Sequence, residues 1–414
     1  MLDLRLIRRD PDAVRAALAR RSPELAERVD ELVDLDAGWR EATASSERMR
    51  AEQKAASEGI AEAKRAGEDA GEAIARMRDL SSQVKALGER ARQAEEQLQS
   101  VLVGLPNLPD ETAADREDEV LREVGPAGRT GRDHLELAGE RIDMERAARV
   151  SGARFAYLRG ELVLLEFALV RWAFEKLSGH GFEPVIPPVL VREEALFGTG
   201  FLPDTEQQIY QLSDDDLYLV GTSEVALASL HAGEILDDLP RRYAAFSSCF
   251  RREAGAAGKD TRGIFRVHQF DKVEMFSFVA PDESRDEHER LLAIEEEILR
   301  ELEIPYRVVN IHVGDLGASA AKKYDCEAWL PGQGRYREVT STSNTTDFQA
   351  RRLQIRFRPG EGERPEVVHT LNGTAVTWRH MIALLENGQR EDGSVELPSV
   401  LAAYGAPATL PAPR

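Results

Sequence analysis

Charged side chains that could hold a nucleotide are concentrated in residues 250–274, FRREAGAAGKDTRGIFRVHQFDKVE. This stretch predicts two strands joined by a glycine-rich, charged loop. Because alternate residues of a strand point to the same face, Arg251 and Glu253 should share one face of the first strand. The second strand should carry a matching set on one face, namely Arg266, Phe270, Lys272 and Glu274. Cations bind phosphate oxygens, an aromatic ring stacks on a nucleobase, and carboxylates bind an ammonium group or a metal ion.

The loop between these strands favours a ligand site, although a simpler interpretation exists. Gly255, Gly258 and Gly263 would let the loop fold over a ligand, and Lys259 and Arg262 could reach that ligand. A surface hairpin with cross-strand ion pairs would show a similar charge pattern. Segments further along the chain decide between the two interpretations.

The first of these segments is a short polar sequence after an apolar one. Residues 217–220 predict a strand that ends in GTSE, and this sequence opens a helix. Thr222, Ser223 and Glu224 could contact a polar substrate. Thr222 or Ser223 could equally be the N-cap of the helix, since hydroxyl side chains are favoured at that position.

Two late segments add a carboxylate and an arginine. Residues 335–342, RYREVTST, alternate as a strand that places Glu338 and Thr340 on one face. Residues 367–371 predict a strand, followed by a glycine turn at Asn372-Gly373-Thr374 and a helix that holds Arg379 among apolar residues. A strand, a glycine turn and a helix with an inward arginine predict a second phosphate-binding element.

Composition narrows the class of protein. The chain has 414 residues, of which 42% are hydrophobic and 31% charged, which predicts a soluble globular protein of two or three domains. The net charge of −20 means that any RNA contact must use local basic patches. The two cysteines, Cys249 and Cys326, support neither a disulfide framework nor a zinc site, as expected in a reducing cytoplasm. MLDLRLIRRD lacks the apolar core of a signal peptide, and the apolar run at residues 162–170 is too short to span a membrane.

Several catalytic classes lack their residues in this sequence. There is no G-x-S-x-G motif and no paired cysteine and histidine, so no enzyme nucleophile is indicated. The GKD sequence at residues 258–260 lacks the serine or threonine and the spacing of a P-loop. The eight histidines are scattered, so we interpret them as structural or surface residues rather than zinc ligands.

The N-terminal part of the chain predicts a long helical arm. Residues 1–25 should form a small helical cap, with Asp10-Pro11 and Ser22-Pro23 as helix starts. Apolar residues then recur at alternating spacings of three and four over residues 32–63, with two polar interruptions, and again over 73–101 without any, with Gly67 and Gly71 between. We expect an antiparallel coiled-coil hairpin over about residues 27–100. A dimerisation coiled coil is the alternative.

The remaining sequence divides into a connector and a larger domain. Residues 105–145 are acidic and punctuated by proline, which is typical of a connector. A thick apolar helix is expected at residues 151–180, followed by an edge strand with Pro187 and Pro188. Together these two elements predict a dimer interface. The expected domains are therefore residues 1–104, the connector 105–145 and a catalytic domain 146–414.

Taken in order, these segments resemble the bacterial-type seryl-tRNA synthetases, a family of class II aminoacyl-tRNA synthetases, over essentially the whole chain. The helix of residues 151–180 with the Pro187-Pro188 strand resembles the first class motif, which is used in dimerisation. FRRE with RVHQFDKVEMF resembles the second motif and LNGTAVTWR the third, while GTSE and EVTSTSN match further substrate-site segments. The resemblance implies an α+β fold, with an antiparallel sheet of about six to eight strands flanked by helices and preceded by the coiled-coil arm.

The resemblance also implies an activity and its partners. The enzyme would be a cytoplasmic, homodimeric serine–tRNA ligase that uses ATP with Mg²⁺, without zinc and without a membrane. It would activate L-serine to seryl-adenylate and transfer the seryl group to the 3′ end of tRNA(Ser), and of tRNA(Sec) as well. The serine carboxylate itself attacks the α-phosphorus, in agreement with the missing enzyme nucleophile.

Carried over residue by residue, the resemblance implies three catalytic residues, Arg251, Arg379 and Glu338. Arg251 would hold the α-phosphate and the serine carboxylate, Arg379 would lie against adenine and near the terminal phosphates, and Glu338 with Ser341 would bind Mg²⁺. The implied ATP contacts are Arg251, Arg252, Glu253, Arg266, Val267, Phe270, Glu338, Val339, Thr340, Ser341 and Arg379. The implied serine contacts are Thr222, Ser223, Glu224, Glu274, Asn372 and Thr374, with Thr222 and Glu224 at the ammonium and Glu274 and Thr374 at the hydroxyl.

Two rival functions fit part of the pattern. Another ATP-dependent aminoacyl ligase on the same fold could charge a carrier protein, but such an enzyme would not need the long arm. A coiled-coil interaction protein with an inactive catalytic domain would not need the complete set of Arg251, Glu253, Glu338 and Arg379.

Overall fold

The structure is a computed structural model that describes residues 1–203, 208–254, 260 and 262–413. It divides into a unit of Leu2–Leu108 and a unit of Pro109–Arg414 together with Met1. Gly255, Gly258 and Lys259, for which we predicted a role over a ligand, lie outside the described residues.

The N-terminal unit is helical, as predicted. Its helices are α1 (Leu4–Arg9), α2 (Pro11–Ala19), α3 (Pro23–Ala66) and α4 (Gly71–Val103). Asp10 and Ser22 cap α2 and α3 by accepting hydrogen bonds from the backbone N–H of Ala13 (3.0 Å) and Leu25 (3.4 Å). These caps satisfy N–H groups that the helix itself leaves without acceptors, so the local sequence is sufficient to start both helices where the prolines indicate.

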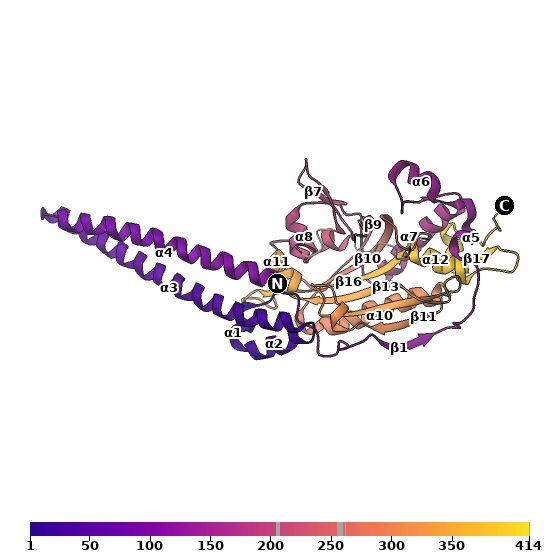
Figure 1. Cartoon of the computed structure of the whole chain (residues 1–414), viewed down its shortest axis with the longest axis horizontal. Helices are drawn as coiled ribbons and strands as arrows, with labels where there is room; N and C mark the ends of the chain where they lie inside the picture. The colour runs from indigo at the N-terminus through magenta and orange to yellow at the C-terminus, as the bar shows by residue number, and fades with distance from the viewer. Residues whose placement is uncertain (204–207, 255–259, 261, 414) are drawn as a thin grey trace. The chain divides into compact units, whose positions relative to one another are not determined.

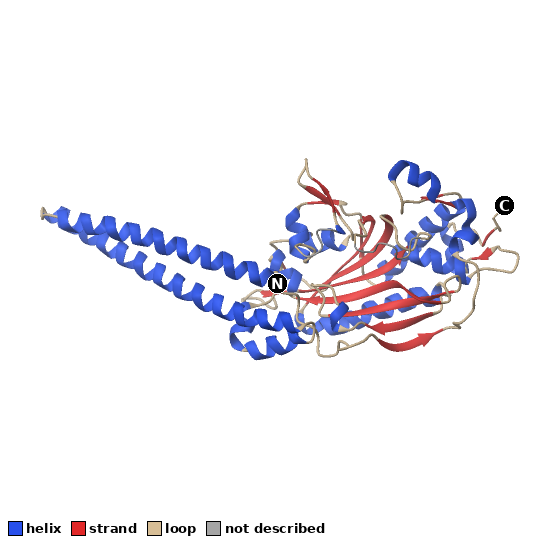
Figure 2. Ribbon diagram, viewed as in Figure 1, coloured by secondary structure: helices blue, strands red, loops and turns tan. Residues whose placement is uncertain are grey.

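Helices α3 and α4 form the predicted antiparallel hairpin (Figures 1 and 2). α3 ends at Gly67, whose φ of +77° is a left-handed conformation that glycine adopts without strain. Leu32 and Leu98 on the predicted seam are fully buried. Because α4 of the same chain covers the apolar stripe of α3, the stripe serves the hairpin, which disfavours the alternative of a dimerisation coiled coil.

The second unit is built on an eight-stranded sheet in the order β1-β11-β12-β13-β16-β10-β9-β4. Its strands are β1 (Glu119–Val124), β4 (Glu183–Val185), β9 (Arg241–Phe250), β10 (Gln269–Val279), β11 (Tyr306–Asn310), β12 (Lys322–Leu330), β13 (Arg335–Thr346) and β16 (His369–Thr377). Neighbours pair antiparallel except β4 and β9, which are parallel. The α+β prediction with an antiparallel sheet is confirmed. The predicted edge strand is confirmed only in part, because β4 lies at the sheet edge but ends at Val185, so Pro187 and Pro188 lie beyond it.

Three helices pack apolar side chains against this sheet in the main core: α7 (Glu161–Gly179), α10 (Ser284–Glu301) and α12 (Trp378–Asn387). The other helices of this unit are α5 (His134–Ala138), α6 (Met144–Ser151), α8 (Glu193–Thr199), α9 (Glu224–Ser229) and α11 (Phe348–Leu353). Short strands complete it: β2 (Ile142–Asp143), β3 (Tyr157–Leu158), β5 (Leu190–Val191), β6 (Tyr210–Leu212), β7 (Leu217–Leu219), β8 (Ile235–Leu236), β14 (Arg356–Phe357), β15 (Glu366–Val367), β17 (Val395–Glu396) and β18 (Thr409–Leu410). No helix among the described residues is long and apolar enough to cross a membrane.

The segment predicted to be a connector, residues 105–145, contributes to the fold instead. Its strand β1 pairs with β11 at one edge of the sheet, and its helix α5 packs against α12. The side chains of β1 are almost all exposed, so the strand lacks the apolar alternation by which strands are recognised in sequence. The prediction of a connector was wrong for this reason.

The apolar helix starts later in the chain than predicted, but its broad apolar surface is as predicted. α7 begins at Glu161 rather than near residue 151, because α6 and β3 occupy the preceding residues. Leu162, Leu165, Leu169 and Trp172 are buried against the core. Leu164 and Phe167 on the same helix are 54% and 62% exposed. The helix therefore presents an apolar face that the described residues leave exposed.

Candidate active site

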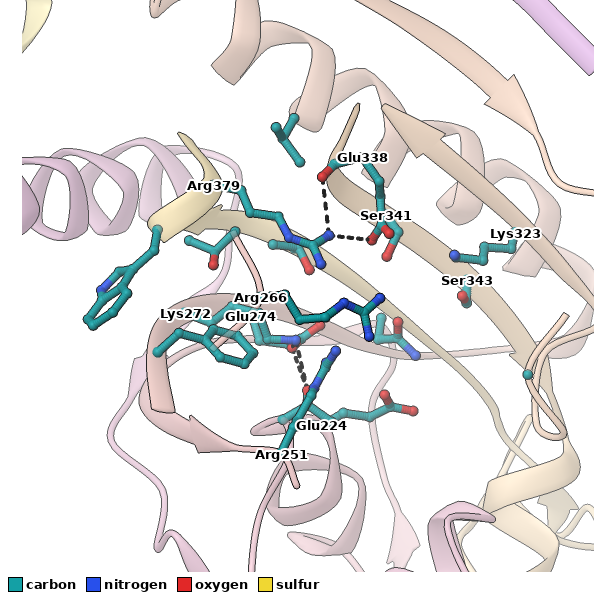
Figure 3. A pocket seen from close by; sticks show the side chains of 18 of the residues that line it. Glu224, Arg251, Arg266, Lys272, Glu274, Lys323, Glu338, Ser341, Ser343 and Arg379 are labelled. Carbon is teal, nitrogen blue, oxygen red and sulfur yellow. Dashed lines mark hydrogen bonds and ion pairs between the residues drawn. The ribbon is translucent and has the colours of Figure 1, made fainter. Parts of the chain in front are cut away.

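A cavity of about 410 Å³ lies over the central strands of the sheet (Figure 3). Strands β10, β13 and β16 and the start of α12 supply most of its wall, together with the described part of the segment between β9 and β10. Of the predicted residues, those that line the cavity are Thr222, Glu224, Arg251, Glu253, Arg266, Val267, Phe270, Glu274, Glu338, Val339, Ser341, Asn372, Thr374 and Arg379. Most of the predicted residues therefore line one continuous cavity.

Three predicted residues do not line the cavity. The Arg252 side chain is exposed outside the wall, although its backbone N–H donates to the carbonyl of Gln208 at 2.9 Å. Ser223 is fully buried behind the wall, and Thr340 lies inside the sheet core. The reason for Thr340 is a β-bulge in β13.

The bulge in β13 changes which residues share a face with Glu338. Cys326 pairs with Thr340 whereas Glu327 pairs with Glu338, so Val339 is an extra residue in the ladder. One extra residue reverses the alternation of side chains beyond it. As a result Ser341 joins Glu338 at the cavity, and Thr340 turns inward and donates a hydrogen bond to the carbonyl of Thr374. The prediction that Glu338 and Thr340 share a face was wrong.

The strand positions predicted for residues 250–274 also need correction. β9 ends at Phe250, and Glu253 has a left-handed backbone with φ of +49°. β10 begins at Gln269, so Arg266 precedes it. Glu253 and Arg266 therefore reach the cavity from the segment between β9 and β10, and not because of alternation along a strand. Phe270, Lys272 and Glu274 do lie on one strand and at one face, as predicted.

At one end of the cavity Arg379 and Glu338 form an ion pair. Arg379 Nη1 lies 3.2 Å from Glu338 Oε1 and donates to the Glu338 backbone carbonyl at 3.1 Å. Partial enclosure of Glu338 opposes its ionisation, but the positive charges of Arg379, Lys323 and Arg251 outweigh it and lower the pKa of Glu338 to about 2. Glu338 is therefore a carboxylate at neutral pH, and Ser341 supplies a second oxygen nearby on the wall (Figure 3).

Two arginine side chains of the cavity lie close to aromatic rings of its wall. The Arg251 guanidinium lies 5.2 Å from the centre of the Phe270 ring, and its Nε donates to the carbonyl of Gly221 at 3.1 Å. The Arg379 guanidinium lies 4.6 Å from the centre of the Phe265 ring. Cations near planar rings suit a ligand that carries both phosphate and a nucleobase.

The opposite end holds a buried polar cluster. The Thr222 hydroxyl donates to Glu274 Oε2 at 2.7 Å, and it accepts from Lys272 Nζ at 2.8 Å and from the backbone N–H of Glu224 at 3.2 Å. Lys272 also forms an ion pair with Glu274. The hydrogen bond from the Glu224 N–H to the Thr222 hydroxyl resembles that of a helix cap. The two interpretations of Thr222 are therefore compatible, because its hydroxyl supports the start of α9 and also lines the cavity.

Glu224 is the carboxyl of this cluster with a strongly altered pKa. Burial and the charge of Glu274 raise the pKa of Glu224 to about 7, although a hydrogen bond from Gln349 Nε2 at 2.7 Å stabilises its ionised form. An incoming ammonium group would offset the charge of Glu274 and favour the carboxylate form of Glu224, so this buried carboxyl suits such a ligand.

Asn372 and Thr374 reach the cavity from a strand rather than from a turn. β16 runs without interruption from His369 to Thr377, so the predicted glycine turn is wrong. Gly373 is needed for close packing: a Cβ there would lie 3.0 Å from both Glu295 Oε1 and Met275 Cε. Glycine inside a strand can mark such a close approach.

Sequence reasoning missed several wall residues, notably Phe265, Lys323, Ser343 and Trp378. Lys323 lies on β12, and its ammonium is 2.9 Å from Asp325. In the antiparallel ladder Lys323 pairs with Ser343 and Asp325 pairs with Ser341. The Lys-x-Asp alternation in residues 323–325 was the available signal, but it points to the site only once the neighbouring strand is known.

Comparison with known proteins shows to which family the chain belongs. The model for the tRNA synthetase class II core domain (G, H, P, S and T) matches residues 208–388, and the model for the seryl-tRNA synthetase N-terminal domain matches residues 1–109. A serine–tRNA ligase of Thermobifida fusca is 52% identical over 412 residues, which are 97% of this chain and 96% of the relative. The chain belongs to the seryl-tRNA synthetase family.

Other comparisons agree with that family. A serine–tRNA ligase of Nocardia farcinica is 51% identical over 98% of both chains. The crystal structure of seryl-tRNA synthetase from Pyrococcus horikoshii, complexed with ATP, superposes with a TM-score of 0.94 at 42% identity and covers 100% of both chains. A prolyl-tRNA synthetase of Giardia lamblia shares the fold alone, with a TM-score of 0.56 at 18% identity over 65% of this chain.

Proposed function

We propose that this seryl-tRNA synthetase catalyses serine–tRNA ligation in two steps within the cavity of Figure 3. Serine and ATP first form seryl-adenylate and pyrophosphate, and the seryl group then passes to the 3′ end of tRNA(Ser). The observation that carries the proposal is one cavity with a Thr222–Glu224–Glu274 cluster at one end, Arg251 between, and the Arg379–Glu338 pair at the other. Each end matches one substrate of the first step.

The polar cluster would bind serine. Glu224, with its pKa near 7, would hold the ammonium as a carboxylate, assisted by Thr222. Glu274 and Thr374 would contact the serine hydroxyl, with Asn372 beside them. A buried carboxylate that needs a hydroxyl partner discriminates strongly against alanine, because alanine would leave it without that partner.

The other end would bind ATP. Phe270 would stack on the adenine, Arg251 would contact the α-phosphate and the serine carboxylate, and Arg266 and Arg379 would contact the terminal phosphates. The serine carboxylate attacks the α-phosphorus and pyrophosphate leaves, so the protein contributes in-line positioning and charge neutralisation rather than a nucleophile.

Glu338 and Ser341 fit a magnesium ion that arrives with ATP. Both are hard oxygen donors, which Mg²⁺ prefers, and Glu338 stays ionised because its pKa is about 2. Mg²⁺ would neutralise phosphate charge during the displacement. The arginines Arg251 and Arg379 would hold the phosphates whether or not the ion is fully coordinated by protein.

Two features outside the cavity would bind macromolecular partners. The N-terminal domain, with the α3–α4 hairpin, would bind tRNA(Ser) and also tRNA(Sec). The exposed apolar face of α7, with Leu164 and Phe167, would be covered by a second copy of the chain in a homodimer, because such a face is rarely left to water. We place the enzyme in the cytoplasm with these substrates.

The decisive experiment measures both steps with purified full-length protein. Pyrophosphate exchange into ATP should depend on serine and be poor with alanine and threonine, and tRNA(Ser) should be charged only with serine. Exchange with serine but transfer to a carrier protein instead of tRNA would support the rival ligase. Absence of any exchange from a folded protein would support the inactive interaction protein.

A further inference from the structure

His134 contacts the wall of the cavity from behind, although it lies in the segment that the sequence predicted to be a connector. It is the first residue of α5 and is 3% exposed. Its Nε2 accepts a hydrogen bond of 3.2 Å from the backbone N–H of Ile264, a residue of the cavity wall. The ring is thus one contact away from the cavity.

The other ring nitrogen is held by Glu386 of α12, which is fully buried. Nδ1 of His134 lies 3.0 Å from Glu386 Oε1, which also accepts from the His134 backbone N–H at 3.2 Å, while Glu386 Oε2 accepts from the backbone N–H of Gly332 at 2.8 Å. Because the Ile264 N–H can only donate, Nε2 must accept this hydrogen bond. Nδ1 therefore carries the ring hydrogen and donates a hydrogen bond to Glu386. The ring is therefore fixed in one tautomer and one orientation.

The chain leaves room for this ring by placing a glycine beside it. Gly263 has a left-handed φ of +80°, and a Cβ at this position would lie 2.1 Å from His134 Nε2. Any other residue would displace the imidazole and break the bond to Ile264. A second contact from the same helix start holds this segment, since Asp133 Oδ2 lies 2.7 Å from Arg262 Nη2.

The residues that follow Ile264 are those that face ATP in the proposed function. Phe265 supplies the ring against which the Arg379 guanidinium lies at 4.6 Å, and Arg266 pairs with Glu253 at 2.5 Å. Residues 262–268 precede β10 and lie outside its ladder. Backbone hydrogen bonds hold the far end of this segment, where His268 accepts from Arg251 at 2.9 Å and donates to Arg154 at 3.0 Å. The contact of His134 with Ile264 holds the other side of Phe265 and Arg266.

We propose that His134 is a positioning residue for ATP: by accepting the Ile264 N–H it holds Phe265 and Arg266 where the nucleotide and its phosphates bind. The inference rests on the proposed ATP site. It assigns a role in substrate binding to α5, although no residue of α5 lines the cavity.

Two substitutions test the hydrogen bonds of the two ring nitrogens separately. His134→Asn keeps an N–H near the position of Nδ1 for Glu386 but is too short to reach Ile264. His134→Gln reaches Ile264 with its side-chain oxygen but gives up the donor to Glu386. In serine-dependent pyrophosphate exchange, His134→Asn should raise the KM for ATP about tenfold. His134→Gln should raise it by about threefold or less, and the KM for serine should change by less than about twofold in both.

A matched control and a second variant complete the test. His180→Asn removes another histidine–carboxylate contact, that of His180 Nε2 with Glu297 at 2.9 Å, and should leave the KM for ATP unchanged. Gly263→Ala should raise the KM for ATP as His134→Asn does, since the added methyl group displaces the ring. Melting temperatures of all variants show whether each is folded.

The outcomes are distinguishable. A selective rise in the KM for ATP in His134→Asn and Gly263→Ala supports the inference. Folded variants with a wild-type KM for ATP, or equal rises for ATP and serine in the Asn and Gln variants, overturn it and leave a structural role only. Wild-type protein without serine-dependent exchange would refute the proposed function itself, and the role of His134 with it.

Discussion

The raised pKa of Glu224 predicts how serine use depends on pH. Burial and the neighbouring Glu274 raise the pKa of Glu224 to about 7, so the carboxyl is mostly protonated below that pH in the free enzyme. Only the carboxylate can pair with the serine ammonium. The competent fraction of enzyme therefore varies as 1/(1 + 10^(pKa − pH)), and kcat/KM for serine should fall about tenfold between pH 8 and pH 6.

The assay is serine-dependent pyrophosphate exchange at saturating ATP across this pH range. Glu224→Gln should bind serine poorly, but its kcat/KM should be nearly flat, because the group that titrates is gone. Gln349→Met removes the 2.7 Å hydrogen bond that favours the carboxylate, so the fall should begin about one pH unit higher. At saturating serine the kcat/KM for ATP should not follow the same curve.

Two results would refute this reasoning. A kcat/KM for serine that is constant from pH 6 to pH 8 in the wild-type enzyme would mean that Glu224 is not the ammonium ligand or that its pKa is not raised. The same fall in Glu224→Gln would assign the titration to another group. Either result would overturn the claim that ionisation of Glu224 controls serine binding.

Four further predictions follow from the same contacts. Glu224→Gln should stabilise the free protein at pH 8 by about 1–3 kcal/mol in thermal melting but not at pH 4. The reason is that the pKa of Glu224 is higher in the folded than in the unfolded protein, so the wild-type protein loses stability as the pH rises from the unfolded-state pKa to about 7. Arg251→Ala, which faces the cavity, should slow exchange by a factor of about 100 while melting near the wild-type temperature; rapid exchange would contradict its contact with the α-phosphate. Gly373→Ala should lower the melting temperature because its Cβ would crowd Glu295 and Met275, and an unchanged value would show that β16 can shift. Replacement of residues 27–100 by a short Gly/Ser linker should leave exchange within a few-fold of wild type and reduce tRNA charging by orders of magnitude, whereas equal loss of both would give the arm a structural role.

The sequence alone was enough for features that depend on neighbouring residues. Heptad spacing, proline after Asp10 and Ser22, and Gly67 between the two apolar runs predicted the helical hairpin, because helix caps and an i, i+3, i+4 stripe act over a few residues. The same holds for the residue types of the site. Arginine, carboxylate and aromatic side chains in short motifs indicated a site for a nucleotide and for an ammonium group or a metal ion.

Only the tertiary structure decided which of these side chains meet. The bulge at Val339 turns Thr340 inward and brings Ser341 to the cavity, and the alternation in the sequence gives no sign of it. Lys323 reaches the wall because β12 pairs with β13, and His134 supports Ile264 across 130 residues of sequence. β1 joins the sheet although its side chains are exposed, since backbone hydrogen bonds to β11 place it. Register, bulges and contacts between distant segments depend on long-range packing, which the order of residue types does not express.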